Sequence, residues 1–200
     1  MDHWNDKELF AKIKEGSKEA LAILFLRYYD YLKHYGYQIV PDSILVEECI
    51  QEMFMYLFES HERLGNVLQV KAYLFSSLRR RLIEKVKKER RRKDGFDIDF
   101  LIQTDIQFSP EDLRLEEENQ RHIREILAQN LNQLPWRQRE AIYLRYHNGL
   151  STKEIAEVMG ITNQTVLNTL YQALKKIRRN KGLQKLLNVF SQGVIFVSQF

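Results

Sequence analysis

Residues 149–179 read GLSTKEIAEVMGITNQTVLNTLYQALKKIRR, and this run is the most informative part of the sequence about the fold and the function. Ser151 and Glu154 form a capping box, in which each side chain accepts a hydrogen bond from a backbone N–H at the start of a helix. Gly160 supplies a tight turn, and Thr162 caps the helix that follows it. The run therefore predicts two helices joined by a glycine turn.

The second helix of such a hairpin can enter the major groove of DNA. Its apolar residues recur on one side, and Asn and Gln, whose amides donate to and accept from base edges, lie on the other. An ordinary helical hairpin is the alternative, but the capping box, the turn and the polar outward face together disfavour it. The candidate DNA-binding residues are Thr162, Asn163, Gln164, Thr165, Asn168, Thr169, Gln172, Lys175 and Lys176.

Helical periodicity extends over almost the whole chain. Only 3 Pro and 8 Gly occur in 200 residues, which fits long helices and few tight turns. We expect helices at about 6–15, 18–38, 42–59, 69–92, 111–133, 136–148, 152–159 and 163–179. The predicted fold class is all-α, with two helical domains joined by a flexible acidic linker.

Charge is distributed in blocks along the chain, although the net charge is only +4. Between residues 79 and 93 ten basic residues face two acids, and between residues 94 and 118 nine acids face one arginine. The acidic block, broken by Gly and Ser-Pro, is typical of a linker, and its composition fits a solvated tether as well as a contact role. The predicted organisation is a first domain at 1–93, a linker at 94–117, a second domain at 118–182 and an apolar extension at 183–200.

The basic block continues a helix in which Phe75, Leu78, Leu82 and Val86 form a narrow apolar stripe. Like charges repel one another on an isolated helix, and a polyanion relieves that repulsion while releasing its counterions. A solubilising face usually mixes both signs, and a membrane-binding helix usually carries Trp. We therefore favour nucleic acid as the ligand, which requires the basic face to turn outward. The candidates are Arg79, Arg80, Arg81, Lys85, Lys87, Lys88 and Arg91.

The helix predicted at about 42–59 carries acids on the side opposite its apolar stripe. A core helix with a solvated back is the plain interpretation, and docking of the acidic face on a basic partner is the alternative. Composition alone favours the former. Cys49 belongs to the stripe, so we expect a small core residue rather than a reactive thiol. The stripe consists of Val46, Cys49, Ile50, Met53, Phe54 and Leu57.

Several function classes are disfavoured by composition. A single Cys leaves no internal disulfide and no multi-cysteine zinc site. No apolar run is long enough to span a membrane, and the first residues lack the pattern of a signal peptide, so we expect a cytoplasmic protein without membrane insertion. The 5 His are scattered, with no HExxH pair and no glycine-rich phosphate loop. We expect no metal, no cofactor, no small-molecule substrate and no catalysis.

Four blocks of the sequence follow one another in a specific order. They are ELF with GSKEAL at 8–21, VEECIQEMF at 46–54, KAYLF at 71–75 ahead of the basic helix, and LP, REA, GLS and EIA between 134 and 156. Together they resemble the sigma-70 family of bacterial transcription initiation factors, and more narrowly its extracytoplasmic-function (ECF) type. In that resemblance the first three blocks are the start of region 2, its polymerase-docking segment and the part that opens and reads the −10 promoter element. The last block resembles region 4, which reads the −35 element.

The resemblance implies a factor that binds core RNA polymerase and directs it to promoter DNA. It implies that the acidic face docks on a basic coiled coil of the polymerase clamp, and that the linker follows the RNA-exit and active-site path, where it mimics nucleic-acid charge. Core polymerase and promoter DNA are thus the expected partners, and the family allows an anti-sigma factor as a third. The polymerase-binding candidates are Glu47, Glu48, Gln51, Glu52 and Met55.

Two pairs of residues depart from the family's pattern. Arg80 and Glu84 stand where the family often has Asn and Asp, near the pocket for a flipped −10 base. Leu167 and Thr169 stand where the recognition helix usually carries basic residues. Leu167 either contacts a thymine methyl or weakens −35 binding. The extension after residue 182 goes beyond the family's core pattern, and its apolar residues fit packing against the protein and binding of a partner equally well.

Two other functions remain as alternatives. A helix-turn-helix regulator would bind DNA without joining the polymerase, and capture of core enzyme distinguishes it from a sigma factor. An adaptor would keep the fold but lack promoter binding. Specific run-off transcripts from a reconstituted holoenzyme would exclude the adaptor.

Overall fold

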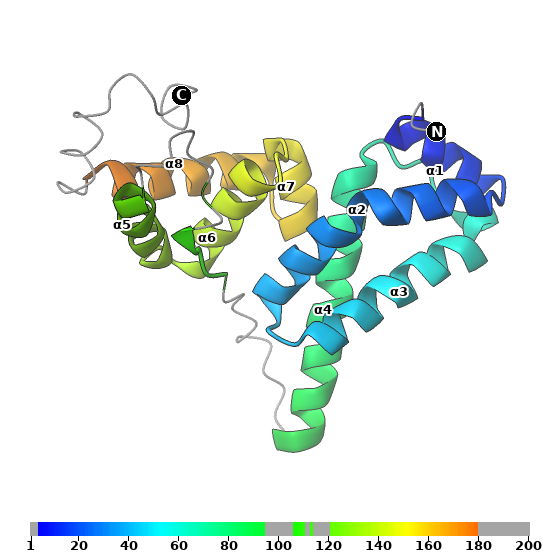
Figure 1. The fold of residues 1–200 in the computed structure, drawn as a ribbon, viewed down its shortest axis with the longest axis horizontal. Coiled ribbons are helices and arrows are strands. Elements are labelled where there is room, and N and C mark those ends of the chain that lie inside the picture. Colours follow the sequence, from blue (N-terminus) through cyan, green and yellow to red (C-terminus); the bar gives the residue numbers. More distant parts are fainter. Residues whose placement is uncertain (1–3, 95–105, 111–112, 114–120, 180–200) are drawn as a thin grey trace.

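The computed structural model describes residues 4–94, 106–110, 113 and 121–179, without the side chains of residues 90–94, 122 and 123. These residues form helices joined by turns and loops and contain no β-strand, so the predicted all-α class is confirmed. They form two lobes, which meet where α7 packs against α4 (Figure 1). The first lobe holds α1 (Asp6–Lys14), α2 (Lys18–Ile39), α3 (Ser43–Glu59), the 3₁₀ turn η1 (His61–Arg63) and α4 (Val70–Asp94). The second holds α5 (Arg121–Asn132), α6 (Trp136–Ile142), the π-helical turn η4 (Tyr143–His147), α7 (Thr152–Met159) and α8 (Asn163–Arg179).

The first domain is built around the apolar stripe of α3, which packs on α2 and α4. All six residues of the predicted stripe are buried. Gly36 of α2 lets α3 approach closely, because a Cβ placed there would stand 2.6 Å from Cγ1 of Val46. Cys49 is buried as expected for a core residue, and burial raises the pKa of its thiol.

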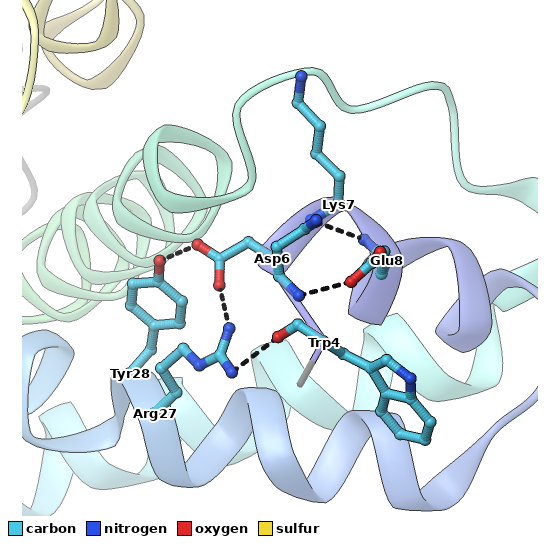
Figure 2. A network of polar contacts seen from close by, with 7 residues as sticks. Trp4, Asp6, Lys7, Glu8, Arg27 and Tyr28 are labelled. Atoms are coloured by element: carbon cyan, nitrogen blue, oxygen red, sulfur yellow. Dashed lines mark hydrogen bonds and ion pairs between the residues drawn. The ribbon is translucent and has the colours of Figure 1, made fainter. Parts of the chain in front are cut away.

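A polar network joins α2 to the start of α1 (Figure 2). Asp6 accepts hydrogen bonds from Arg27 Nη1, at 2.7 Å, and from the hydroxyl of Tyr28. Arg27 also donates from Nη2 to the carbonyl of Trp4, at 2.9 Å. Burial, followed by the hydrogen bond to Asp6, raises the pKa of Tyr28. The network is thus a carboxylate held by an arginine and a tyrosine of its own domain.

The helix-turn-helix predicted from residues 149–179 is present. Ser151 Oγ accepts from the backbone N–H of Glu154 at 3.3 Å, and Glu154 Oε2 accepts from the N–H of Ser151 at 2.7 Å. Gly160 ends α7 in the left-handed conformation, with φ of 65°. The hydroxyl of Thr162 then accepts from the N–H of Thr165 at 3.1 Å, which starts α8.

One predicted helix is not a regular α-helix. The run expected at 136–148 is α-helical only to Ile142 and then widens into η4, where Asn148 N donates to Tyr143 O at 3.2 Å, five residues back. A π-helical turn holds one extra residue, which a periodicity of 3.6 residues does not reveal. Gly149, with φ of 67°, ends the segment in the left-handed conformation.

Residues 106–110 belong to the predicted linker and lie against both domains. Ile106 and Phe108 are buried. The backbone of Phe108 exchanges two hydrogen bonds with the side chain of Asn132, at 2.8 and 3.0 Å, and Gln107 N donates to Gln38 Oε1 at 2.9 Å. This piece of the linker is therefore a packed contact rather than a solvated tether. Residues 95–105, 111–112 and 114–117 and the extension at 183–200 lie outside the described residues.

Candidate nucleic-acid and polymerase interface

Helix α8 buries one face and exposes the other. Val166, Leu170, Ala173 and Ile177 are buried, because α6 and α7 pack on this side. Of the nine DNA-binding candidates, Thr169 is half-buried and the others are exposed. The polar face expected from the sequence is therefore accessible along the helix.

Hydrogen bonds within α8 order part of that face. Gln164 Nε2 donates to Asn168 Oδ1 at 3.1 Å, so the two amides lie side by side with their remaining donors and acceptors directed outward. The hydroxyl of Thr169 donates to the carbonyl of Thr165 at 2.7 Å. Thr169 is thus engaged by its own helix, whereas Gln164 and Asn168 keep capacity for base edges.

Two large apolar side chains lie on the same exposed face. Leu167 is 44% exposed and Tyr171, one turn further, is 61% exposed. Lys175 Nζ lies 5.7 Å from the centroid of the Tyr171 ring. The face therefore combines amides, an aliphatic group and an aromatic ring beside a cation.

The basic candidates of α4 differ in their surroundings. Arg80 and Lys88 are exposed, whereas Arg81 lies over the ring of Tyr56, 5.4 Å from its centroid. Arg79 is paired with Glu140 and Lys85 with Glu52, and Lys87 is half-buried. The side chain of Arg91 lies outside the described residues. The basic face thus turns outward only in part.

The acidic face of α3 is accessible. Glu48, Gln51 and Glu52 are exposed, and Met55 is 59% exposed. Glu47 accepts from Lys33 of α2 at 2.6 Å, a contact that raises the pKa of that lysine. The five polymerase-binding candidates therefore share one helix, with Glu47 at the border with α2.

Lys85 connects the acidic face of α3 to the basic helix. Its Nζ lies 2.7 Å from Glu52 Oε1 and 3.6 Å from Glu48 Oε2. Partial burial opposes the charged form of Lys85, but the hydrogen bond that Lys85 donates to Glu52 favours it, and the pKa of Lys85 is raised. A candidate for DNA binding is thus neutralised by two candidates for polymerase binding.

A buried carboxylate lies where the two domains meet. Glu140 of α6 has no exposed surface and accepts from Arg79 Nε at 2.8 Å, from Arg79 Nη2 at 3.3 Å and from the hydroxyl of Tyr35 at 2.9 Å. Burial opposes the charge of Arg79, yet the attraction of Glu140 raises the pKa of this arginine. Burial and the negative charge of Glu140 raise the pKa of Tyr35 as well. Arg79, a DNA-binding candidate, is therefore directed inward.

Aromatic rings surround this contact. Tyr143 of η4 is fully buried and stacks with His147 at 4.6 Å between ring centroids and with Tyr35 at 6.2 Å. His34 of α2 stacks on His147 at 5.1 Å, and Phe108 lies 6.1 Å from Tyr143. Rings from the first domain, the linker and the second domain thus form one cluster.

Apart from Arg79, the residues of this junction were not among the predicted site residues. Glu140 carried a signal, because it lies four residues after Trp136 and four before Leu144, on what would otherwise be an apolar stripe. A carboxylate in such a stripe indicates a buried partner of opposite charge. The identity of that partner, Arg79, is not accessible from local pattern because sixty-one residues separate the two.

The described residues contain neither a metal site nor a membrane-spanning helix. Within the part of the chain that the structure describes, no group of three or more His, Cys, Asp or Glu side chains is placed to hold a metal ion. No helix in the described part of the chain combines the length and the apolar character needed to cross a membrane.

Family models match both domains. The model for sigma-70 region 2 matches residues 24–92, and the model for sigma-70 region 4 matches residues 124–177. The first match contains α3 and the basic part of α4, and the second contains the helix-turn-helix. Each candidate surface thus lies in a matched region.

Known proteins resemble the chain over most of its length. The ECF RNA polymerase sigma factor SigX of Bacillus subtilis is 29% identical over 83% of this chain and 86% of its own. The RNA polymerase sigma-H factor of Pseudomonas aeruginosa is 30% identical over 91% of this chain and 95% of its own. Among solved structures, CnrH in complex with the cytosolic domain of CnrY superimposes with a TM-score of 0.57 at 19% identity, covering 92% of this chain and 97% of that one. RpoE of Bartonella quintana, in complex with the anti-sigma factor NepR, gives 0.54 at 21% identity over 84% and 96%.

The solved structures support the fold, and the sequence relatives and family models support the family. Region 2 precedes region 4 along the chain. The acidic face and the basic helix lie in the region 2 match, and the recognition helix lies in the region 4 match. The chain therefore belongs to the sigma-70 family, as an ECF-type sigma factor that directs RNA polymerase to promoters.

Proposed function

We propose that the first domain opens and reads the −10 element while the second reads the −35 element. The observation that carries this proposal is the exposed amide-bearing face of α8, whose opposite face is buried. Asn163, Gln164 and Asn168 read base edges, and Lys175 and Lys176 contact phosphates. Arg80, Arg81 and Lys88 contact the melted strand near −10, where long basic side chains need no strict register. The other DNA-binding candidates keep supporting roles on the same two helices.

The acidic face of α3 is the proposed contact with the polymerase clamp. Glu48, Gln51 and Glu52 are exposed and lie on one helix with Met55, which offers an apolar anchor beside the acids. A surface of this kind fits a basic partner with an apolar centre. In the complex with polymerase, the linker leaves the packed position that residues 106–110 occupy in this structure and follows the RNA path of the polymerase.

The proposal also includes the domain bounds, the lack of catalysis, the cellular compartment and a third partner. The domain bounds are 1–93, 94–117, 118–182 and 183–200, and the matched ranges 24–92 and 124–177 fall inside the two domains. The factor acts through binding energy and catalyses nothing itself, in keeping with its family. It works in the cytoplasm, where promoter DNA and polymerase are located. An anti-sigma factor is proposed as a third partner on the ground of the family alone.

Run-off transcription with core polymerase and the purified chain tests this function. Promoter-specific transcripts that depend on the chain are expected, and their absence in the presence of polymerase binding would favour the adaptor. Arg80→Ala with Arg81→Ala should lower open-complex formation, measured by permanganate reactivity, more than polymerase affinity. The exposed Arg63→Ala serves as a control of equal chemistry in the same domain. Equal loss of both activities in the double variant would remove this division of roles.

A further inference from the structure

Glu140 belongs to the second domain, but its carboxylate is hydrogen-bonded to side chains of the first domain. All three hydrogen bonds that the structure shows to its carboxylate come from Arg79 and Tyr35, on the other side of the domain boundary. We propose that Glu140, Arg79 and Tyr35 form a latch, which holds the free factor in a closed state unable to engage both promoter elements. The link to promoters rests on the function proposed above, whereas the latch itself does not.

The chemistry of the latch favours closure in the intact chain. A carboxylate without exposed surface is stable only when it is paired and hydrogen-bonded, and Glu140 has a bidentate arginine and a hydroxyl donor. Lys71 of α4 adds a second polar contact by donating to the backbone carbonyl of Asn148. The stacked rings of Tyr35, Tyr143 and His147 contribute apolar contact around the pair.

Distance along DNA makes the closed state incompatible with a promoter. The −10 and −35 elements lie roughly 25 base pairs apart, which is roughly 85 Å at about 3.4 Å per base pair. Two packed domains of this size have centres only roughly 30 Å apart. Because α7 packs on α4 and Glu140 is bonded to Arg79, one domain cannot reach −35 while the other holds −10. The domains must separate before both elements are bound.

Opening also changes what Arg79 can do. In the closed state Arg79 is only 15% exposed and its guanidinium is occupied by Glu140. In the open state both groups return to water, and Arg79 joins the basic face of α4 that already includes Arg80 and Lys88. The surface that docks on the polymerase is exposed in the closed state, so polymerase can bind first and separate the domains afterwards.

The test measures the distance between the domains in the full chain. Nitroxide labels at Glu19→Cys and Gln129→Cys occupy exposed positions on α2 and α5, and the buried Cys49 does not react. Pulsed electron paramagnetic resonance of the otherwise unchanged chain should give one short distance, which lengthens when core polymerase and promoter DNA are added. A wild-type distribution that is already long without polymerase would overturn the latch.

Two variants weaken the latch from opposite sides. Glu140→Gln changes the second domain and leaves Arg79 buried without a counter-ion. Tyr35→Phe changes only the first domain and removes the hydroxyl that donates to Glu140. Hydrogen bonds to charged groups change such equilibria roughly ten- to hundredfold, so the open population should rise by at least about tenfold for Glu140→Gln. An unchanged distance distribution in a folded variant would overturn the proposal. If Glu140→Gln fails to fold, Tyr35→Phe alone decides the question.

A matched control exists within the first domain. Asp6, like Glu140, is held by an arginine and a tyrosine, but both partners belong to its own domain (Figure 2). Asp6→Asn should lower the stability of the first domain and leave the interdomain distance unchanged. A longer distance in Asp6→Asn would show that general loosening, not the latch, opens the molecule, and would overturn the proposal.

Transcription separates this inference from the proposed function. With an active wild-type factor, Glu140→Gln should shorten the lag before promoter-specific transcripts, because less free energy is needed for opening. An inactive wild type that still closes and opens as described would refute the promoter roles and leave the latch intact. An active wild type whose distance is insensitive to both variants would refute the latch and leave the promoter roles intact.

Discussion

Lys85 Nζ lies 2.7 Å from Glu52 Oε1, which places a basic residue of α4 in contact with the acidic face of α3. The two surfaces assigned to DNA and to polymerase are therefore electrostatically coupled through this lysine, and Glu48 adds a second acid at 3.6 Å. A lysine that is already neutralised releases fewer counterions from DNA than an unpaired one. Binding of polymerase to Glu48 and Glu52 would free Lys85 for phosphate.

The salt dependence of DNA binding tests this coupling. Lys88→Ala, at an exposed position, should reduce the slope of log K against log salt by about 0.7 on single-stranded DNA, and Lys85→Ala should reduce it by clearly less. Fluorescence anisotropy of the full chain on the −10 strand supplies the slopes. With Glu48→Gln and Glu52→Gln in place, Lys85→Ala should match Lys88→Ala. Equal slopes in the unmodified background would contradict the coupling.

The exposed face of α8 should determine the −35 preference. Gln164→Ala should relax discrimination at one base by about 1–3 kcal/mol, since a bidentate amide contact is lost. Leu167→Ala should weaken a preference for thymine without a comparable loss at other positions. Selection from a promoter library with reconstituted holoenzyme measures both. Lys175→Ala is the matched control, because loss of a phosphate contact should weaken binding uniformly across sequences.

The caps of the helix-turn-helix should control the stability of the second domain. Ser151→Ala removes one hydrogen bond of the capping box and should cost about 1 kcal/mol. Gly160→Ala should lower the free energy of unfolding by roughly 1–2 kcal/mol, because an alanine is strained in the left-handed conformation. A clash does not contribute, since a Cβ at this position would meet no atom within 4 Å. Urea unfolding measures both changes. At Gly65 a Cβ would also meet no atom within 4 Å, and φ is not positive there, so Gly65→Ala should leave the free energy of unfolding nearly unchanged. A comparable loss in that control would contradict the backbone explanation.

Alkaline pH should weaken the first domain through Tyr28. Burial and Asp6 raise the pKa of Tyr28, so the folded chain keeps this phenolic proton where the unfolded chain, with a tyrosine pKa of about 10, loses it. The folded state then binds more protons, and stability falls as pH rises above about 10. Tyr28→Phe should make that fall shallower in urea unfolding at several pH values. Tyr171→Phe, at an exposed ring, should leave the slope unchanged. Identical slopes for Tyr28→Phe and wild type would contradict this account.

Much of the fold follows from local chemistry. The capping box of Ser151 and Glu154, the left-handed Gly160 and the buried stripe around Cys49 are each determined by residues within a few turns of one another. Local rules therefore predicted the helices and the exposed face of α8. The same rules missed the π-helical turn at Tyr143–His147, because its extra residue leaves no trace in the hydrophobic period.

The candidate site was predictable only where its residues act alone. Exposure of Gln164, Asn168 and Glu48 follows from helical periodicity. The inward direction of Arg79 does not, since its partner Glu140 belongs to the other domain. A run of arginines gives no indication of which member is withdrawn, because their side chains are chemically alike and only tertiary packing distinguishes them.

The arrangement of Glu140 bears on hybrid factors made by exchanging halves between relatives. A foreign second domain with an apolar residue in place of Glu140 would leave Arg79 and Tyr35 facing a surface that accepts no hydrogen bond. Such a chimera would lose its resting conformation even if each half folded well. Grafts between these proteins therefore need the acid and its two donors to be transferred as one unit.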